Sequence, residues 1–510
     1  MVEQIVIGID VGTGGCKTVA FDLEGHLVAE AFREYPVHHP KIDWAEQNPD
    51  DWWEAACSTL RKVTSKLDPE SIVAVGLTSQ REAFVPLDKD GRKLYDSIIW
   101  LDSRTIPQER EIKKLIPAEK VLSVTGLPVD YIFSAAKLLW FKKNLPNIFK
   151  RINAILFAKD YIAFKLCGEI ATDFSMASRT MLFDIHKLKW SDEICDALDI
   201  PTSILPNIVG SWEVVGEVTS EASETTGLPK GVPVVSGGGD RPCEALGAGA
   251  YKVGDVNIGT GTGTVFEVPL SKPRPDPDGL IDCCHHVVPE TWEYEIIINS
   301  TGESLRWFRD NFGYEEVCRG SEEKVSPYVI FDRLASDVPI GSRGLFYYPY
   351  LWGARAPKFN PYARSAFIGF THAHGKPAFV RAILEGVAFQ YVETLEIAKR
   401  LGVQVRRITM TGGEAKSRLW NQIKADVLGM DVEIPEILDA AALGACILAA
   451  VGIKAYKDFP HAVEEMVRIS RVFRPEKESH EKYMKLYEAY QEVYRYYSSC
   501  FDILADVSRC

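Results

Sequence analysis

One short design occurs twice in this chain and limits the possible folds more than any other feature. Residues 5–22 read as a β-hairpin, with apolar residues at nearly every position from Ile5 to Ile9 and a glycine-rich turn, Gly12-Thr13-Gly14-Gly15. Residues 255–268, DVNIGTGTGTVFEV, repeat the order of strand, glycine-rich turn and strand. Two copies about half a chain apart predict two domains of related fold that face one nucleotide.

The chemistry of the first turn suits a phosphate group. Successive backbone N–H groups in such a turn form an anion-binding nest, and glycines let a phosphate approach the backbone closely. Asp10, just before the turn, is placed to hold a hydrated Mg²⁺, and Lys17 adds positive charge on the return strand. Taken alone, this stretch is equally compatible with an ordinary hairpin that has a glycine loop.

Length and charge narrow the class of protein. A chain of 510 residues is expected to form two large domains. The net charge of −13 argues against binding to duplex nucleic acid or to an anionic membrane. The longest small-apolar run, 440–453, is too short to span a bilayer, so we expect a buried helix whose alanines allow close packing.

Cysteine usage and the N-terminus bear on the compartment. The 11 cysteines include no CxxC pair and are odd in number, which disfavours a disulfide framework and favours a reducing cytosol. No signal-like segment precedes the first strand, so we expect a cytoplasmic protein.

Three predicted buried strands run into polar or glycine-rich segments. Residues 71–78 end on Ser79-Gln80-Arg81-Glu82, residues 232–236 run into Gly237-Gly238-Gly239-Asp240, and residues 407–411 run into a double glycine. Such strand ends are where α/β proteins bind ligands, and a helix N-terminus after a double glycine is typical of an anion or nucleotide site. Periodicity predicts helices at the following positions: 135–141, 158–166, 378–400, from Cys243, from about Leu419, and a single tail helix over 480–504.

In this order and spacing the motifs resemble those of sugar and polyol kinases of the FGGY family, within the actin, hexokinase and heat-shock-ATPase fold group. The resemblance covers nearly the whole length and includes the hairpin at 10–17, WAEQNPDDWW from Trp44, GLTSQREA from Gly76, IIWLDSRT from Ile98, TGLPVDYIFSAAKLLW from Thr125, SGGGD ending at Asp240, the hairpin at Gly259, and TGGEAKSRLWNQIKADVLG from Thr411.

The resemblance implies a two-domain α/β fold of the actin/hexokinase-like ATPase type, with duplicated ribonuclease H-like domains and the active site in the interdomain cleft. We expect residues 1–246 to contain the sugar site, the first phosphate hairpin and the catalytic Asp. Residues 247–510 are expected to contain the second phosphate hairpin, the adenosine site and the C-terminal helix. Such enzymes transfer the γ-phosphoryl group of ATP, with Mg²⁺, to a sugar hydroxyl, which requires mainly alignment and charge neutralisation.

Residue roles follow from the same resemblance. Asp240, after three glycines, is the candidate general base, with capping of the following helix as the alternative. For Gly302, a glycine at a helix start is the alternative role. The implied nucleotide and metal contacts are Gly12, Thr13, Gly14, Gly15 and Lys17 at the β- and γ-phosphates, Thr260 and Gly261 in the second hairpin, Gly302 and Arg306 along the nucleotide, Gly412, Gly413 and Ser417 near the ribose and adenine, and Asp10 at the metal.

On the acceptor side, Arg81 and Glu82 match the pair that grips substrate hydroxyls in glycerol kinases. Trp100 and Tyr131 match that enzyme's aromatic wall and a further hydroxyl contact. The alternative is that Arg81 and Glu82 form an ion pair with each other and that Trp100 belongs to the core.

Departures from the family pattern bear on the acceptor. Arg241 stands where many glycerol kinases have an amide, and Gly263 where they have an aromatic residue, which favours a longer, more hydroxylated or even acidic acceptor. Residues 413–417 and 441–444 resemble the xylulokinase branch, although Asp439 stands where Glu is usual and the segment 80–82 is unlike that branch. We therefore expect phosphorylation of a terminal hydroxyl of a ketopentose such as xylulose or ribulose, with glycerol as the alternative.

Two rival classes share part of this pattern. An actin- or chaperone-like ATPase would have the hairpins but no use for the acceptor set, and a non-catalytic sugar sensor would be expected to lose Asp10 or Asp240, both of which are retained. We expect a small sugar or polyol as partner, with no nucleic acid and no membrane. The oligomeric state stays open, with a homodimer or a homotetramer as options.

Overall fold

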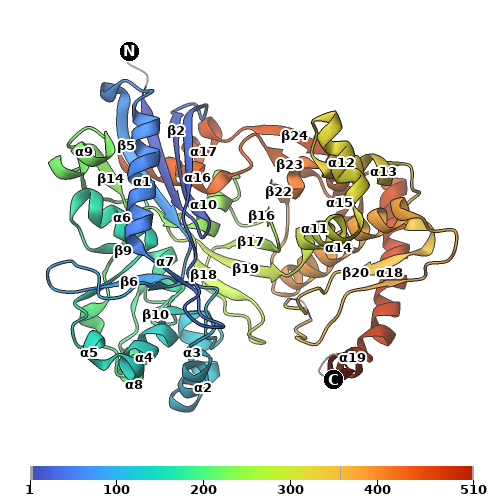
Figure 1. The fold of residues 1–510 in the computed structure, drawn as a ribbon, viewed down its shortest axis with the longest axis horizontal. Coiled ribbons are helices and arrows are strands. Elements are labelled where there is room, and N and C mark those ends of the chain that lie inside the picture. Colours follow the sequence, from blue (N-terminus) through green and yellow to red (C-terminus); the bar gives the residue numbers. More distant parts are fainter. Residues whose placement is uncertain (1–3, 357, 508–510) are drawn as a thin grey trace. The chain divides into compact units, whose positions relative to one another are not determined.

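The computed structural model describes residues 4–356 and 358–507. The chain forms two compact units that alternate along the sequence. The first unit comprises Met1–Tyr251, Pro269–Tyr294 and Asp439–Arg468, and the second comprises Lys252–Val268, Glu295–Leu438 and Ile469–Cys510. Each unit is built around a mixed β-sheet with helices against it (Figure 1).

The sheet of the first unit has the strand order β13-β14-β5-β1-β2-β3, with β15 also beside β5. Strand β1 pairs antiparallel with β2 and parallel with β5, which confirms the expected hairpin. This register places Asp10 opposite Lys17 on β2 and opposite Thr78 on β5. The bounds are β1 (Ile5–Val11), β2 (Gly15–Asp22), β3 (Leu27–Glu34), β5 (Ile72–Ser79), β13 (Val214–Glu217), β14 (Pro233–Val235) and β15 (Gly238–Gly239).

Helices cover both faces of this sheet. Ile7 and Ile9 pack in one core with Trp52 of α1, whereas an added Cβ at Gly8 would lie 2.5 Å from the carbonyl oxygen of Ala442 in α16. Because alternate residues of a strand face opposite sides, α1 and α16 lie on opposite faces. The helices of this unit are α1 (Pro49–Thr64), α2 (Ile106–Leu115), α3 (Ala118–Thr125), α4 (Ser134–Asn144), α5 (Pro146–Phe149), α6 (Ala158–Cys167), α7 (Phe174–Ser178), α8 (Asp192–Leu198), α9 (Ser220–Thr226), α10 (Asp240–Gly247), α16 (Ala440–Gly452) and α17 (Phe459–Met466).

The second unit repeats the central arrangement. Strand β16 pairs antiparallel with β17 and parallel with β22, as β1 does with β2 and β5. This confirms the duplicated design that the two hairpins predict. Its strands are β16 (Asp255–Thr260), β17 (Thr264–Leu270), β19 (Trp292–Ile298), β22 (Arg407–Gly412), β23 (Val432–Pro435) and β24 (Ile469–Phe473).

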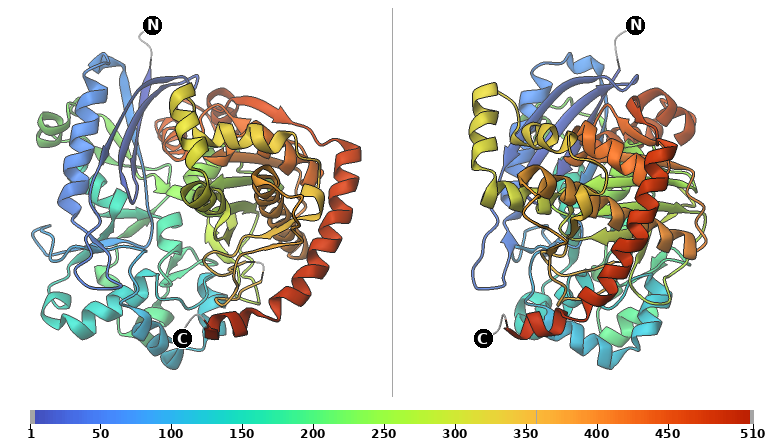
Figure 2. Two further views of the ribbon diagram at one scale, coloured as in Figure 1. Left: turned by 45° about the vertical axis from the view of Figure 1, so that its right-hand side comes forward. Right: turned by 90° about the vertical axis from the view of Figure 1, so that its right-hand side faces the viewer.

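The long helices of the second unit pack through aromatic side chains. Helix α18 runs along the outside of this unit (Figure 2), where Tyr483, Tyr487 and Tyr490 contact Phe389 of α14. The helices are α11 (Thr301–Phe312), α12 (Tyr314–Glu323), α13 (Pro327–Ser336), α14 (Lys376–Arg400), α15 (Arg418–Leu428), α18 (Lys477–Ser498) and α19 (Phe501–Val507).

Short elements complete the chain. The remaining strands are β4 (Glu46–Gln47), β6 (Phe84–Leu87), β7 (Ser97–Ile98), β8 (Ala154–Phe157), β9 (Ala171–Asp173), β10 (Phe183–Asp184), β11 (Lys189–Trp190), β12 (Asn207–Val209), β18 (Asp282–His285), β20 (Phe346–Tyr348) and β21 (Ala366–Ile368). The 3₁₀ turns are η1 (Pro69–Ser71), η2 (Thr202–Ile204), η3 (Ser342–Gly344) and η4 (Glu414–Lys416).

Two helix predictions need correction. Helix α10 begins at Asp240 rather than Cys243, and a negative charge in the first turn suits a helix N-terminus. The tail is two helices rather than one, because α18 ends at Ser498. The Ser498 and Ser499 hydroxyls donate to the carbonyls of Arg495 and Tyr496, and such local bonds compete with helix continuation.

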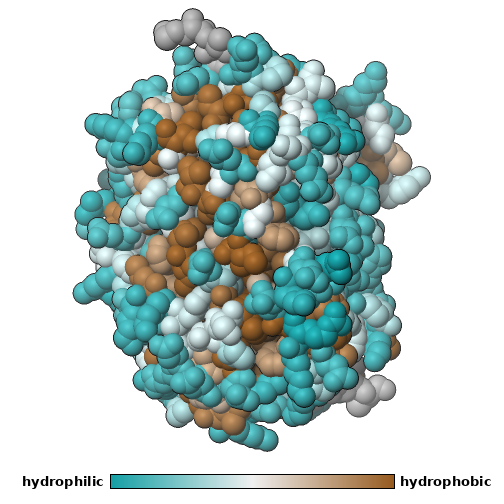
Figure 3. Space-filling view, turned by 90° about the vertical axis from the view of Figure 1, so that its left-hand side faces the viewer, coloured by the Kyte–Doolittle hydropathy of each residue, from teal (hydrophilic) through white to brown (hydrophobic). Residues whose placement is uncertain are grey.

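The molecular surface drawn in Figure 3 has a central band of hydrophobic side chains between hydrophilic ones. Apolar side chains make up a large share of the surface of folded proteins. Within residues 4–356 and 358–507, no helix combines the length and apolar character needed to cross a membrane.

Candidate active site

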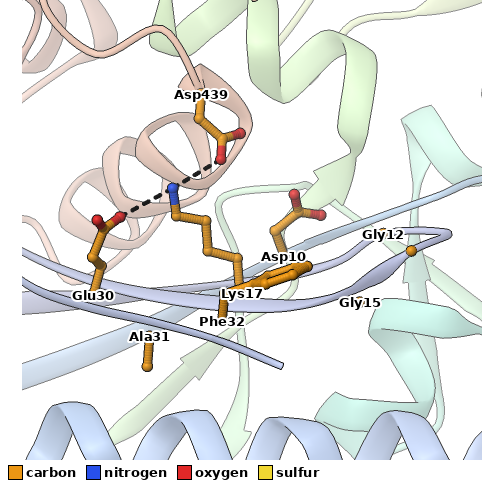
Figure 4. A pocket seen from close by; sticks show the side chains of 9 residues that line it. Asp10, Gly12, Gly15, Lys17, Glu30, Ala31, Phe32 and Asp439 are labelled. Carbon is orange, nitrogen blue, oxygen red and sulfur yellow. Dashed lines mark hydrogen bonds and ion pairs between the residues drawn. The ribbon is translucent and has the colours of Figure 1, made fainter. Parts of the chain in front are cut away.

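The turn between β1 and β2 borders a pocket of about 530 Å³ in the first unit (Figure 4). The Gly12 N–H donates to the Gly15 carbonyl at 3.0 Å, and the single Tyr35 hydroxyl proton is shared between the carbonyls of both glycines. An added Cβ at Gly14 would meet no atom within 4 Å, so the turn presents open backbone. The pocket is lined by Asp10, Gly12, Gly14, Gly15, Lys17, Glu30, Ala31, Phe32 and Asp439.

Asp10 carries a buried and unsatisfied carboxylate. Among the described residues its Oδ1 atom finds no hydrogen-bond partner. Burial raises the pKa of Asp10 well above its ordinary value, and the carboxylates of Asp439 and Asp240 raise it further. A buried carboxylate that ionises with difficulty and lacks a donor fits a divalent cation, which would supply the missing positive charge.

Lys17 points into the same pocket from β2 (Figure 4). Its Nζ atom lies 2.9 Å from Asp439, just before α16, and 3.1 Å from Glu30 on β3. Burial lowers the pKa of Lys17, but the hydrogen bonds and charges of Asp439 and Glu30 outweigh this and raise it. Lys17 therefore stays protonated and supplies positive charge beside the turn.

Asp240 is the first residue of α10, and Gly239 is the N-cap. The Oδ1 atom of Asp240 lies 3.0 Å from Arg81 Nε and accepts the Arg241 N–H at 2.8 Å. The Asp240 side chain is 36% exposed. Gly237 has φ +72°, and a Cβ there would lie 1.7 Å from the Leu77 carbonyl, so only glycine fits. Asp240 is thus a carboxylate at a strand end, oriented by a guanidinium and open to solvent, and it does not occupy the N-cap position that the alternative role requires.

Arg81 and Glu82 each have a charged partner elsewhere. Arg81 pairs with Asp240, whereas Glu82 Oε1 accepts from Arg179 Nε at 2.7 Å. Arg179 also donates to Asp282 at 2.7 Å. The sequence does not identify Arg179 as a site residue, because Arg179 lies 97 residues from Glu82 and no local motif surrounds it.

Trp100 is not a core residue, since its side chain is among the exposed large hydrophobic groups at 43% exposure. Its indole N–H donates to Thr13 Oγ at 2.9 Å, and the Thr13 hydroxyl donates to Gln80 Oε1 at 3.1 Å. Gln80 in turn donates to Gln47 Oε1 at 2.7 Å, and Gln47 donates to the Thr13 carbonyl at 2.7 Å. Gln47 belongs to the WAEQNP segment, which resembles the family but contains no residue with an expected role in the site.

Tyr131 and Arg241 complete the predicted acceptor set. Tyr131 is half-buried, and its carbonyl accepts from Thr105 Oγ at 2.7 Å. The Arg241 guanidinium lies 2.7 Å from Glu244, one helical turn further along α10. The positive charge of Arg241 is therefore balanced within the helix.

In the second unit, Thr260 ties its hairpin to β22. The Thr260 hydroxyl donates to the Thr411 carbonyl at 2.5 Å and accepts the Glu414 N–H at 3.1 Å. The Gly261 N–H closes the turn on the Gly263 carbonyl at 2.8 Å. Thr260 thus has a structural role here, whatever contact it makes with a ligand.

Gly302 has a packing role at the first turn of α11. A Cβ at Gly302 would lie 2.2 Å from the Gly261 carbonyl, so helix and turn meet closely there. Arg306, one turn further along, pairs with Glu303. The packing supports the alternative role for Gly302 and brings it beside the second glycine-rich turn.

The end of β22 exposes backbone in the way the double glycine predicts. Gly412 has φ +79°, and a Cβ at Gly413 would meet no atom within 4 Å. Ser417 caps α15 and donates to Asp332 Oδ2 at 2.7 Å, and burial raises the pKa of Asp332 to about 6. The sequence did not point to Asp332.

Comparison with protein families decides the class. A family model described as "FGGY family of carbohydrate kinases, N-terminal domain" matches residues 5–247, and the corresponding C-terminal domain model matches residues 256–453. The chain belongs to the FGGY family of carbohydrate kinases. The expected resemblance and the two-domain α/β fold are confirmed.

Individual FGGY kinases match over nearly their full length. The xylulose kinase of Bacillus subtilis is 31% identical over 96% of this chain and 97% of its own. The gluconokinase of the same species is 29% identical over 99% and 98%, and the glycerol kinase of Thermococcus kodakarensis is 30% identical over 96% and 96%. The crystal structure of xylulose kinase from Rhodospirillum rubrum superposes with a TM-score of 0.89 at 28% identity, covering 98% of this chain and 100% of that one.

These findings establish an ATP-dependent sugar kinase. The relatives carry three different acceptor names at nearly equal identity. The comparisons therefore identify the reaction class, and the choice of acceptor rests on the residues of this chain.

Proposed function

We propose that this FGGY kinase transfers the γ-phosphoryl group of ATP to a terminal hydroxyl of a ketopentose such as xylulose or ribulose, with Asp240 as the general base. The observation that carries the proposal is the Asp240 carboxylate, which is partly exposed at the end of a glycine segment and oriented by Arg81 at 3.0 Å. Asp240 accepts the proton of the attacking hydroxyl, and the charge-assisted bond from Arg81 orients its carboxylate.

The nucleotide is assigned to the glycine-rich turns. In the first unit, the open backbone at 12–15 binds the terminal phosphates, and Lys17 exchanges its carboxylate partners for phosphate oxygens. In the second unit, the contacts assigned to the nucleotide are those of Thr260, Gly261, Gly302, Arg306, Gly412, Gly413 and Ser417.

Asp10 is the residue that would hold Mg²⁺. Its buried Oδ1 atom lacks a donor among the described residues, and its pKa is raised by burial, both of which a cation would offset. When bound, the ion would neutralise phosphate charge during transfer.

The acceptor assignment rests on the charge balance around Asp240. Glu244 neutralises Arg241 at 2.7 Å, which favours a neutral polyhydroxyl acceptor over a sugar acid. The exposed face of Trp100 suits the C–H face of a sugar. Glycerol is the second candidate, because Arg81, Glu82 and Trp100 match its kinases and a glycerol kinase is 30% identical.

The deciding experiment measures ADP release from ATP and Mg²⁺ with purified protein against xylulose, ribulose, glycerol, gluconate and several aldoses. We expect the highest kcat/KM with a ketopentose. A clear preference for glycerol would contradict our interpretation of Arg241 and Gly263, and a preference for gluconate would contradict the charge argument at Glu244. Equal rates of ADP release with every sugar and without any sugar would contradict sugar-dependent phosphoryl transfer.

The general-base role is tested with Asp240→Asn. We expect kcat to fall by about 10²- to 10⁴-fold while the KM values for ATP and sugar change little. Asp192→Asn is a matched control, because Asp192 is also the first residue of a helix and pairs with a cationic side chain, that of Lys189 at 3.0 Å, but it lies outside the motifs that resemble the family. Near-normal turnover of Asp240→Asn would refute the role.

A further inference from the structure

The glycine segment that leads to Asp240 is held at both ends by buried side chains. At its start, Lys159 Nζ donates to the Ser236 carbonyl at 3.1 Å. At its end, the Gly239 N–H donates to Ser175 Oγ at 2.9 Å. Lys159 and Ser175 are almost completely buried, at 0% and 1% exposure.

Both anchors converge on one carboxylate, that of Asp173. Lys159 Nζ lies 3.1 Å from Asp173 Oδ1, and Ser175 Oγ donates to Asp173 Oδ2 at 2.5 Å. Lys159 also lies 2.6 Å from Asp160. A buried ion cluster of this kind contributes little net stability, because desolvation offsets the attraction, so its presence here calls for another explanation.

The segment needs such external support because it has no side chains of its own. Gly237 occupies the left-handed region at φ +72°, and Gly238 and Gly239 pair with β5 only through Thr78 and Ser79. Glycine has the widest conformational freedom of any residue. Hydrogen bonds from neighbouring elements must therefore determine where Asp240 stands.

We propose that Asp173, Lys159 and Ser175 are positioning residues that fix the Asp240 carboxylate for proton transfer. This inference rests on the proposed general-base role of Asp240. Asp173 orients the Ser175 hydroxyl and the Lys159 ammonium, and these two groups hold the ends of the segment. None of the three is proposed to touch ATP or sugar.

Ser175→Ala tests the inference with little risk to folding, whereas Asp173→Asn would leave Lys159 short of a buried counter-charge. Ser211→Ala is the matched control. Ser211 Oγ donates to the same Asp173 Oδ2 at 2.7 Å, but Gly239 donates to Ser175 and not to Ser211. Both variants thus remove one hydroxyl from Asp173, but only Ser175→Ala removes a hydrogen bond to the segment, because Ser211 accepts from the Gly237 N–H through its backbone carbonyl, which Ser211→Ala keeps.

We expect Ser175→Ala to lower kcat by about 10- to 100-fold and to keep the KM values for ATP and sugar seen in Ser211→Ala. Its Tm should be somewhat lower than that of Ser211→Ala, because the buried Gly239 N–H loses its acceptor. Ser211→Ala should keep kcat close to that of the unmodified protein. In the Asp240→Asn background, adding Ser175→Ala should cause no further loss, because the group it positions is gone.

Equal kcat for the two serine variants would overturn the inference. A further loss of the same size in the Asp240→Asn background would also overturn it, since Ser175 would then act independently of Asp240. Near-normal turnover of Asp240→Asn alone would instead refute the general-base role, which separates the two failures.

Discussion

Lys17 at the pocket shows how one side chain can matter for binding and little for folding. Its partners Asp439 and Glu30 are 55% and 53% exposed, and exposed ion pairs contribute at most about 1 kcal/mol. A contact from a charged group to phosphate is worth about 1.5–3 kcal/mol. We therefore expect Lys17→Gln to keep the Tm but to raise the KM for ATP by about 10- to 100-fold.

Lys93→Gln is the control for this comparison. Lys93 also lies near two carboxylates, those of Asp50 at 2.9 Å and Asp96 at 3.2 Å, but it does not line the pocket. Steady-state kinetics give the KM for ATP of both variants, and thermal unfolding gives their Tm. The same KM for ATP in both would remove Lys17 from the nucleotide site.

Asp332 predicts a pH dependence of stability. Its ordinary pKa of 3.8 is raised by burial to about 6 in the folded protein, so between these values the folded state binds the proton and the unfolded state does not. The stability from this group is present below about pH 4 and is lost as pH rises through 6. Asp332→Asn, which can still accept from Ser417, should gain about 1–2 kcal/mol over the unmodified protein at pH 7.5.

Thermal unfolding from pH 4 to pH 8 checks this sign. The Tm advantage of Asp332→Asn should be small at pH 4 and should grow through pH 6. An advantage that shrinks as pH rises would show that the carboxylate is stabilised, rather than penalised, by its surroundings.

At the residue scale, the sequence predicts those site residues that lie inside local motifs. The open backbone at Gly14 and Gly413 and the strand-end position of Asp240 follow from short patterns. Arg179 could not be predicted, because its contact with Glu82 depends on how distant segments pack. Arg241 and Glu244 have the i, i+3 spacing of an ion pair on a helix, so their pairing could be predicted from the sequence. The effect of this pair on the acceptor could not be predicted, because it depends on where Asp240 lies.

At the scale of elements, α16 shows why its sequence consists of small residues. An added Cβ at Gly8 of β1 or Gly76 of β5 would lie 2.5 Å or 2.1 Å from carbonyl oxygens of this helix. Gly444 of α16 meets α10 just as closely, at 1.9 Å from the Cys243 carbonyl. The close packing expected from the alanine-rich run is confirmed, and backbone meets backbone on both sides of the helix.

Two glycine substitutions separate packing from binding. Gly76→Ala places a methyl group 2.1 Å from the Ala445 carbonyl and should destabilise the protein by about 1–3 kcal/mol. Gly14→Ala meets no atom within 4 Å, so it should keep the Tm and raise the KM for ATP by filling the space a phosphate needs. A fall in Tm for Gly14→Ala with unchanged KM would contradict the binding role of the turn.

Most elements are predictable because their periodicity and caps are local. Asn48 accepts the Asp50 N–H at the start of α1, as its place before Pro49 predicts. The start of α10 is not predictable in the same way, since Gly239 provides no side-chain cap and the strand before it bonds to β5. The break after α18 depends on serine hydroxyls that are equally compatible with a continuous helix.

At the scale of the whole molecule, the first unit requires chain from far along the sequence. Residues 439–468 belong to it, and within it Cys446 Sγ lies 3.8 Å from the Val6 carbonyl and Arg468 donates to the Glu24 carbonyl at 2.7 Å. Periodicity cannot reveal this, because a buried helix near residue 440 has the same pattern whichever sheet it covers.

The interleaving predicts how fragments of the chain behave. Residues 1–251 alone lack α16 and leave one face of β1 and β5 uncovered, so this fragment should aggregate and show no cooperative unfolding. Residues 1–251, 269–294 and 439–468, joined in this order by flexible linkers, contain every segment of the first unit and should unfold cooperatively. Circular dichroism during heating distinguishes the two, and a cooperative transition in the 1–251 fragment would show that α16 is dispensable. Apolar strand faces are stable only when they are covered, so the restored helix α16, rather than the added length, should account for the cooperative unfolding. A third fragment, the linked one with Cys446→Asp in α16, should therefore lose cooperative unfolding.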